Sequence, residues 1–181
     1  QVYALGEMSK DGFEMDQVSP DAVKQSLAIL LDTSNRDRID GKDLYELATD
    51  TIRLDHHVKV EDLATLDYVD EAASATGEIV AQLLQVNAQH PGSAAAQDLY
   101  RALTADSQRF TTGNTRPESL MAGAWLLQEG DDVVADLLAS SRTSMQAWRY
   151  QNCIRSTAVQ MQKFLFSVME PQDYLQYGLA E

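Results

Sequence analysis

The sequence has only one cysteine, Cys153, among its 181 residues, and no apolar run long enough to cross a membrane. A lone cysteine cannot form an internal disulfide, so the composition favours a reducing compartment, and we expect a cytoplasmic protein. The first residues also lack the basic start and apolar core of a secretory signal peptide. Neither a disulfide-stapled secreted domain nor a membrane-bound protein is therefore expected.

Basic residues are scarce as well. The chain has 14 Lys and Arg against 28 Asp and Glu, which gives a net charge of 14 − 28 = −14. An acidic surface repels nucleic acid, so long duplexes are not expected as ligands. A small anionic substrate stays compatible with this charge, because metal ions and a few arginines can reverse the potential inside one site.

Apolar runs alternate with segments of helical spacing. Strands are predicted at residues 2–5, 26–31, 51–54, 66–69 and 164–168, and helices at 41–48, 74–86, 94–105, about 115–130, about 131–162 and 170–175. The continuous run Ser26–Leu31 is typical of a strand buried on both faces of a parallel sheet. Ser74 is the predicted N-cap of one helix, and Thr115–Glu118 has the spacing of a capping box.

This alternation predicts an α/β fold, a mostly parallel sheet flanked by helices. We expect residues 1–129 to form that domain, because the alternation continues up to there. Residues 130–162 are predicted to form a helical linker, and residues 163–181 the start of a second domain.

Two of the predicted strands end on an aspartate, Asp32 and Asp55, and two histidines, His56 and His57, follow the second of these. Ligands of open α/β sheets bind beyond the carboxyl ends of the strands, so these side chains should converge. Carboxylate and neutral imidazole together suit manganese, zinc or iron. The alternative is that the two histidines belong to an exposed polar loop.

Five segments resemble successive motifs of the DHH phosphoesterases in order and spacing. They are DTSNRDRI (32–39), IRLDHH (52–57), DYVDEAASATGE (67–78), LTADSQRF (103–110) and NTRPESL (114–120). Within that family the chain is most similar to the bacterial oligoribonuclease and 3′-phosphoadenosine-5′-phosphate phosphatase type. A bare Asp-His-His would be weak support, whereas several motifs in order make chance similarity improbable.

The resemblance implies a role for each matching residue. Asp32 matches the aspartate that bridges two metal ions, and His56 and Asp106 match ligands of one ion each. His57 matches the histidine that faces the substrate. Asp55 is expected to orient the histidines or complete the site rather than to act alone.

The resemblance also implies the cofactor and the substrate. Two manganese ions are expected, with magnesium, cobalt and zinc left open, and the implied substrates are very short RNA or 3′,5′-bisphosphorylated adenosine. Arg38 and Arg109 are candidate phosphate contacts, because a guanidinium can grip phosphate through two hydrogen bonds. A structural salt bridge is the alternative for each arginine. Cleavage of cyclic or linear dinucleotides, pyrophosphate or polyphosphate, and a homodimeric assembly, stay open.

Two family features have no counterpart in this sequence. The first motif, His-x-x-x-Asp-x-Asp, supplies further metal ligands, and a glycine- and histidine-rich loop in a second domain binds substrate; neither is present. We expect that the chain begins about one strand and one helix late and by itself binds metal weakly and turns over little substrate. The alternative is a non-catalytic nucleotide- or metal-binding module.

Overall fold

The computed structural model describes residues 19–140 and 142–176, so the strand expected at residues 2–5 lies outside them. The chain divides into two compact units, Gln1–Val134 and Ala135–Glu181. Each unit is described by itself below. The three-part division expected from the sequence stays a prediction.

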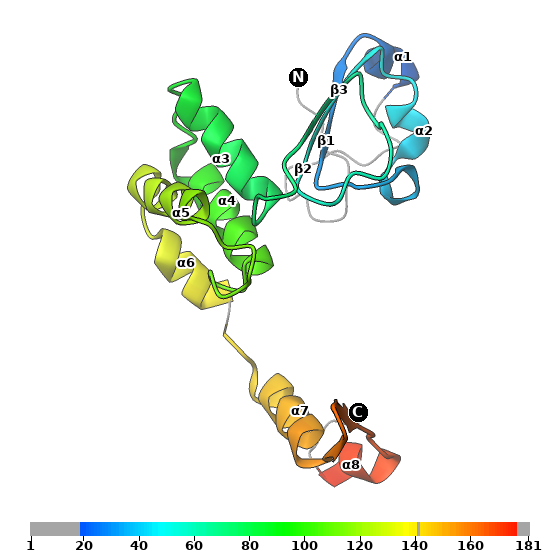
Figure 1. The fold of residues 1–181 in the computed structure, drawn as a ribbon, viewed down its shortest axis with the longest axis vertical. Helices are drawn as coiled ribbons and strands as arrows, with labels where there is room; N and C mark the ends of the chain where they lie inside the picture. The colour runs from blue at the N-terminus through cyan, green and yellow to red at the C-terminus, as the bar shows by residue number, and fades with distance from the viewer. Residues whose placement is uncertain (1–18, 141, 177–181) are drawn as a thin grey trace. The chain divides into compact units, whose positions relative to one another are not determined.

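The first unit holds a parallel sheet with helices beside it, as the alternation of the sequence predicts (Figure 1). Its elements are α1 (Pro20–Lys24), β1 (Leu27–Leu31), η2 (Arg36–Arg38), α2 (Lys42–Tyr45), β2 (Asp50–Asp55), β3 (Leu66–Val69), α3 (Thr76–Val86), α4 (Gly92–Asp106) and α5 (Pro117–Glu129). A further helix, α6 (Val133–Ser140), spans the boundary between the units. The α/β prediction is confirmed.

The sheet has the strand order β1-β2-β3, and both pairings are parallel. One face packs on a small core of Leu30, Ile39, Tyr45 and Leu63. The other face carries Leu27, Ile29 and Leu31, which are 51%, 56% and 52% exposed. The prediction that β1 is buried on both faces is therefore wrong for the described residues, since alternate side chains of a strand point to opposite faces and only one face here meets a core.

A buried ion pair joins β2 to β3. Arg53 is fully buried, and its Nη2 donates to Asp67 Oδ2 over 2.9 Å and to the Glu61 carbonyl over 3.1 Å. Its Nε also lies 2.9 Å from Asp67 Oδ1, but without the alignment of a hydrogen bond. A buried charge needs such a partner, so the pair ties β2 to β3 just before the two strands end.

Helices α3, α4 and α5 pack on one another beside the sheet (Figure 1). Their shared core is small in side-chain size and consists of Ala75, Ala81, Ala96, Leu103, Ala122, Leu126 and Val133. Gly77 permits the close contact between α3 and α4, because a Cβ there would lie 3.1 Å from the Ala102 Cβ. Small residues at the crossing therefore let the helix backbones approach.

Two predicted helix caps are wrong in their details. The N-cap of α3 is Ala75 without a side-chain cap, while the hydroxyl of Ser74 is used elsewhere. The N-cap of α5 is Arg116, and the capping box pairs it with Ser119 rather than pairing Thr115 with Glu118. Ser74 and Arg116 both bond to the buried carboxylate of Glu78, a contact that a spacing rule does not detect.

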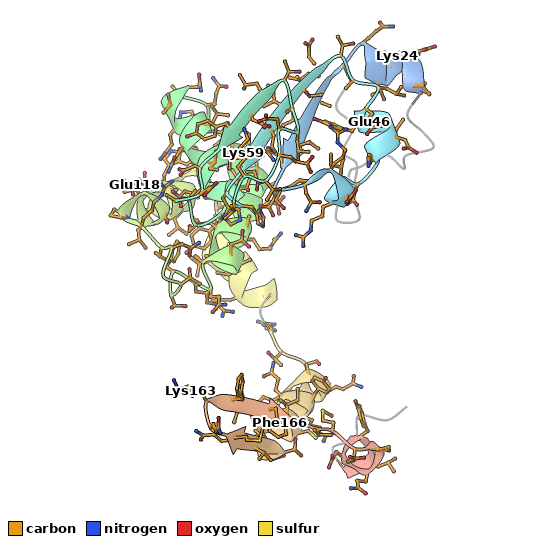
Figure 2. The ribbon with its side chains drawn as sticks, turned by 45° about the vertical axis from the view of Figure 1, so that its right-hand side comes forward. Lys24, Glu46, Lys59, Glu118, Lys163 and Phe166 are labelled. Atoms are coloured by element: carbon orange, nitrogen blue, oxygen red, sulfur yellow. The ribbon has the colours of Figure 1, made fainter. Side chains whose placement is uncertain are left out.

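The second unit contains α7 (Met145–Ser156), the antiparallel pair β4 (Ala158–Met161) and β5 (Phe164–Ser167), and α8 (Pro171–Gln176). Figure 2 shows Lys163 at the turn of this hairpin and Phe166 on β5. The strand and the short helix expected after residue 163 are confirmed. The helix expected to reach residue 162 is wrong, because α7 ends at Ser156 and residues 158–161 pair with β5 instead.

No helix in the described part of the chain combines the length and the apolar character that crossing a membrane requires.

Candidate metal centre

The carboxyl ends of the three parallel strands lie side by side at one edge of the sheet. Asp32 directly follows β1, and its backbone N–H donates to the Leu54 carbonyl over 3.1 Å. Asp70 directly follows β3, and its N–H donates to the Asp55 carbonyl over 3.0 Å. The ladder therefore continues one residue beyond β1 and β3, which brings three carboxylates to the edge where α/β sheets bind ligands.

Four of the predicted residues come together at this edge. Asp32, His56 and His57 offer ligand atoms that all lie within 4.8 Å of one another. Asp32 Oδ1 lies 3.5 Å from His56 Nε2 and 3.8 Å from His57 Nδ1. Asp106, the last residue of α4, places its Oδ2 3.6 Å from His56 Nε2. The ends of two strands and of one helix thus place these side chains around His56 Nε2.

Asp55 organises the turn that carries both histidines. Its side chain is fully buried, and Oδ1 accepts the backbone N–H groups of His56 and His57 over 2.9 and 3.2 Å. The same oxygen lies 2.8 Å from His57 Nδ1, so this nitrogen carries the proton and Nε2 keeps the lone pair in the neutral ring. Asp55 therefore contacts both histidines, while its supporting role in the site stays a prediction.

His56 is oriented by the backbone of a different segment. Its Nδ1 lies 3.3 Å from the Ala73 carbonyl, which can only accept a hydrogen bond. The Nδ1–H tautomer follows, and Nε2 keeps its lone pair on the side of Asp32 and Asp106. A histidine that donates its other ring N–H to a carbonyl is the usual arrangement of a metal ligand.

Asp32 adopts a backbone conformation that is rare for a residue with a side chain. Its φ is 60°, in the left-handed region, which Asp and Asn tolerate best among non-glycine residues. The Thr76 hydroxyl at the start of α3 donates to its Oδ1 over 2.7 Å. Such strain, worth about 1 kcal/mol or more, concentrates at functional sites.

Asp106 lies where a carboxylate is electrostatically disfavoured. Burial raises the pKa of its carboxyl, the negative charge of Asp32 raises it further, and the two histidines oppose this. The C-terminal end of a helix is also the negative end of its dipole. A cation between Asp106 and Asp32 would offset all three unfavourable effects, namely burial, the charge of Asp32 and the helix dipole.

The residues at this edge fit a metal ion. Ligands bound at about 2.1 Å in tetrahedral or octahedral geometry lie roughly 3.0–3.5 Å apart, close to the 3.5 Å between Asp32 Oδ1 and His56 Nε2. Asp55 Oδ2 is buried and has no hydrogen-bond partner among the described residues. Mixed carboxylate and imidazole donors suit manganese or zinc better than calcium.

The two predicted phosphate contacts are not brought into this cluster by any hydrogen bond or ion pair. Arg38 ends η2 and Arg109 follows α4, both exposed, and neither side chain forms such a contact within residues 19–140 and 142–176. The structural salt bridge considered for each is therefore not observed in that part of the chain. Both guanidinium groups are left with their donors available.

Arg109 lies in an unusual turn directly after Asp106. Gln108, Arg109 and Phe110 have φ values of 46°, 62° and 63°, three consecutive residues in the left-handed region. The Arg109 N–H donates to the Thr104 carbonyl over 2.8 Å, and the Phe110 ring packs against Gly123 of α5. The turn is thus held at both ends while the Arg109 side chain stays exposed.

Sequence reasoning missed the residues behind the cluster. Arg116 bonds to both Asp70 and Glu78, although the sequence indicated only a helix start at this position. Glu78 closes the segment 67–78 that resembles a family motif, but no separate role was predicted for it. The signal that could have been used is Arg116, directly before the proline of NTRPESL. A buried acidic residue such as Glu78 needs a cation, and this arginine supplies it.

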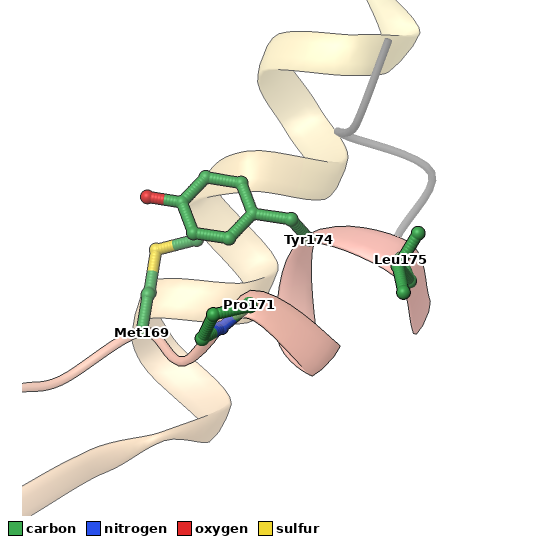
Figure 3. Close-up of a pocket in the computed structure, with 4 residues that line it drawn as sticks. All are labelled: Met169, Pro171, Tyr174 and Leu175. Atoms are coloured by element: carbon green, nitrogen blue, oxygen red, sulfur yellow. The ribbon is translucent and has the colours of Figure 1, made fainter.

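A shallow pocket in the second unit is apolar and is lined by Met169, Pro171, Tyr174 and Leu175 (Figure 3). None of these side chains is a usual metal ligand, and none carries a charge at neutral pH. The pocket therefore offers no group for hydrolytic chemistry.

Comparison with known proteins relates the chain to one family. The N-terminal domain of the DHH family matches residues 2–105. An uncharacterized protein of Mycoplasma genitalium is 35% identical over 118 residues, which are 65% of this chain and 36% of that protein. A probable bifunctional oligoribonuclease and PAP phosphatase, NrnA, of Streptococcus mutans is 30% identical over 144 residues, 77% of this chain and 46% of that protein. The chain thus spans less than half of either relative.

One solved structure has the same fold over nearly the whole chain. An exopolyphosphatase-related protein of Bacteroides fragilis superposes with a TM-score of 0.76 and 17% sequence identity, covering 96% of this chain and 54% of that one. At this identity the likeness concerns the fold alone.

Proposed function

The chain belongs to the DHH family, and we propose that it forms most of the catalytic domain of a metal-dependent phosphoesterase. The proposed substrates are short oligoribonucleotides and 3′,5′-bisphosphorylated adenosine, cleaved to mononucleotide and phosphate. The observation that carries the proposal is the meeting of Asp32, His56 and Asp106, with donor atoms 3.5 and 3.6 Å apart, at the carboxyl edge of the sheet. The similarity to the NrnA protein of Streptococcus mutans supports the choice of substrates.

The metal proposed for this site is manganese, bound as a pair of ions in the intact protein. Asp32 would lie between them, and His56 and Asp106 would hold one ion each. Bound metal would supply a nucleophile from water at neutral pH and polarise the phosphoryl oxygens. The remaining ligands of such a pair are proposed to come from outside the described residues, because these three donors alone cannot complete two coordination shells.

His57 is proposed to act on the substrate rather than on the metal. Asp55 holds its Nδ1–H at 2.8 Å, and the ring is 39% exposed, so Nε2 remains available for substrate. In its protonated form this nitrogen would stabilise charge on the phosphoryl group or donate a proton to the leaving oxygen.

The charge of the chain favours a small substrate. With a net charge of −14, the protein repels a long polyanion, whose binding depends on many phosphate contacts. Arg38 and Arg109 are proposed to bind one or two terminal phosphates, which is sufficient for a dinucleotide or a bisphosphate. A cytoplasmic location, where such short products of RNA decay occur, is part of the proposal.

Hydrolysis by the intact protein with manganese tests the assignment. We expect release of AMP from the linear dinucleotide pApA and of phosphate from bisphosphorylated adenosine, with at least a tenfold loss when the metal is chelated. Cyclic dinucleotide, pyrophosphate and polyphosphate are the comparison substrates, and preference for one of them would replace the proposed substrate but keep the enzyme. If no phosphate ester is hydrolysed with any divalent metal, the chain is a non-catalytic binding module.

The turn after α4 allows a matched test of Arg109. Replacing either Arg109 or Gln108 by glycine relieves one left-handed backbone position, where φ is 62° and 46°, and adds freedom to the unfolded chain. We expect both variants to change the free energy of unfolding by less than about 1 kcal/mol. Only Arg109→Gly should raise KM, by roughly tenfold to a hundredfold, because it alone loses a charge-assisted contact with phosphate.

The comparison of the two glycine variants excludes a purely structural effect. Steady-state kinetics on bisphosphorylated adenosine and thermal unfolding would be measured for both. Equal KM values for Gln108→Gly and Arg109→Gly would remove Arg109 from the substrate site.

A further inference from the structure

We propose that Arg116 is a positioning residue of the metal centre, acting on His56 and Asp32 through the segment 70–76 that joins β3 to α3. The proposal deepens the proposed function and rests on it, because it concerns how the same ligands are held. Arg116 itself makes no contact with either ligand in the structure. It bonds to the carboxylates of Asp70 and Glu78, and the segment between them bonds to the two ligands.

The guanidinium of Arg116 grips both ends of this segment. Its Nη2 donates to Asp70 Oδ2 over 2.5 Å, directly after β3, and its Nε donates to Glu78 Oε1 over 2.6 Å, in the first turn of α3. Arg116 is the N-cap residue of α5, so one side chain joins three elements. The planar fork of arginine suits this double contact, whereas the single ammonium of lysine does not.

Glu78 fixes the middle of the segment as well. Its Oε2 accepts the Ser74 backbone N–H over 3.0 Å, the Ser74 hydroxyl over 2.9 Å and the Ser119 hydroxyl over 2.6 Å. Ser119 in turn accepts the Arg116 backbone N–H over 3.2 Å, so Glu78, Ser119 and Arg116 form a closed ring of contacts. The carboxylate and both serines are fully buried, and such satisfied networks hold their members in one arrangement.

The segment held in this way carries the groups that orient two metal ligands. The Ala73 carbonyl accepts the Nδ1–H of His56, which keeps Nε2 free, and the Thr76 hydroxyl binds Asp32 Oδ1. Ala73 lies between Asp70 and Ser74, and Thr76 lies between Ser74 and Glu78, so each contact is bracketed by anchored residues. Loosening the anchors therefore frees both ligands together.

The network stays charged at neutral pH. Burial raises the pKa of the Glu78 carboxyl, but the hydrogen bonds from Ser119, Ser74 and Arg116 outweigh burial and hold it below its usual range. The pKa of Asp70 is lowered in the same way, with the Arg116 contact overcoming the effect of burial. Replacing a buried ion network with apolar groups often costs little stability, so this network is better explained by the geometry that it fixes.

Manganese binding by Arg116→Lys tests the proposal on the chain itself. We expect the dissociation constant for Mn²⁺, measured by electron paramagnetic resonance, to rise about tenfold to a hundredfold, as when other groups that orient a metal ligand are lost. In the metal-free protein at about pH 8, where imidazole is neutral, ¹⁵N NMR should show the Nδ1–H tautomer of His56 in the wild type. The variant should show a mixture of both tautomers.

The control is Leu126→Val in the same helix, which loses packing in the helical core but whose side chain cannot form a hydrogen bond to the segment or to its anchors. It should lower the unfolding temperature while leaving both the Mn²⁺ affinity and the His56 tautomer unchanged. Should Arg116→Lys fail to fold, Ser119→Ala removes one hydrogen bond from Glu78 and is expected to raise the dissociation constant about threefold.

Three results would contradict the account in different places. Wild-type affinity and tautomer in Arg116→Lys, or in a Ser119→Ala variant used in its stead, would overturn the positioning role alone. Equal losses of affinity in Leu126→Val would show that Arg116 acts only through stability. Failure of the wild type to bind Mn²⁺ would overturn the proposed metal centre, and the positioning role with it.

Discussion

Asp32→Asn is expected to abolish metal-dependent hydrolysis by the intact protein, with a loss of at least about 10³-fold in kcat/KM. Asparagine keeps the shape of the side chain, tolerates the φ of 60° and can still accept the Thr76 hydrogen bond on its amide oxygen. It removes the charge that lies 3.5 Å from His56 Nε2 and 3.8 Å from His57 Nδ1. The fold should therefore survive while metal binding is lost.

Asp37→Asn is the matched control for this change. Asp37 lies in η2, its side chain is 96% exposed, and among the described residues it pairs only with Lys42, at 3.8 Å. Activity, thermal unfolding and Mn²⁺ binding would be measured on both variants. Asp32→Asn with more than a tenth of the wild-type kcat/KM would contradict the central role given to Asp32.

His57→Gln is expected to lower kcat about 10²- to 10⁴-fold, the usual contribution of a proton donor or of a group that stabilises charge in the transition state. The Mn²⁺ dissociation constant should change by less than about threefold, because the proposed ligands Asp32, His56 and Asp106 all remain. His57 itself bonds to Asp55 through Nδ1 and is assigned to the substrate. A KM close to that of the wild type would indicate that His57 acts mainly in the transition state.

His90→Gln is the control for His57→Gln. His90 is also partnered by a carboxylate, since its Nδ1 lies 2.8 Å from Glu129 Oε2, but its side chain is 76% exposed and lies after α3. We expect wild-type kinetics for this variant. If His57→Gln keeps full kcat, or loses Mn²⁺ as strongly as His56→Gln does, the division of roles between the two histidines is wrong.

The first layer of the site could be predicted from the sequence because it lies at strand ends. Leu31 and Leu54 close two apolar runs, and the next residue of each run is the aspartate that the structure finds at the sheet edge. Parallel pairing then brings these ends together without further information. Asp106, by contrast, reads as an ordinary helix end, and only the family resemblance pointed to it.

The second layer could not be predicted because it depends on contacts between distant segments. Arg116 meets Asp70 and Glu78, 46 and 38 residues away, and no periodicity in the chain records such a pairing. The predicted caps failed for the same reason, because Ser74 bonds to Glu78 instead of capping α3, and Arg116 rather than Thr115 is the N-cap of α5 and bonds to the same carboxylate. Buried polar partners are chosen by tertiary structure, which local propensity does not contain.

The remaining misses concern burial and helix length. A continuous apolar run suggested that β1 is covered on both faces, yet Leu27, Ile29 and Leu31 are about half exposed in the structure. Residues 158–161 have no helical breaker, but pairing with β5 makes them a strand. In both cases the outcome depends on which neighbour is present, and the composition of the segment cannot specify that.

The anomalous signal of manganese in crystals of the protein tests the central claim most directly. We predict a peak within about 2.0–2.4 Å of His56 Nε2 and of an Asp32 carboxylate oxygen, while a second ion of the pair would contact Asp106 in place of His56. The peak should be absent from crystals of Asp32→Asn. A manganese ion bound only elsewhere, or no ion at this edge of the sheet at saturating concentration, would contradict the account.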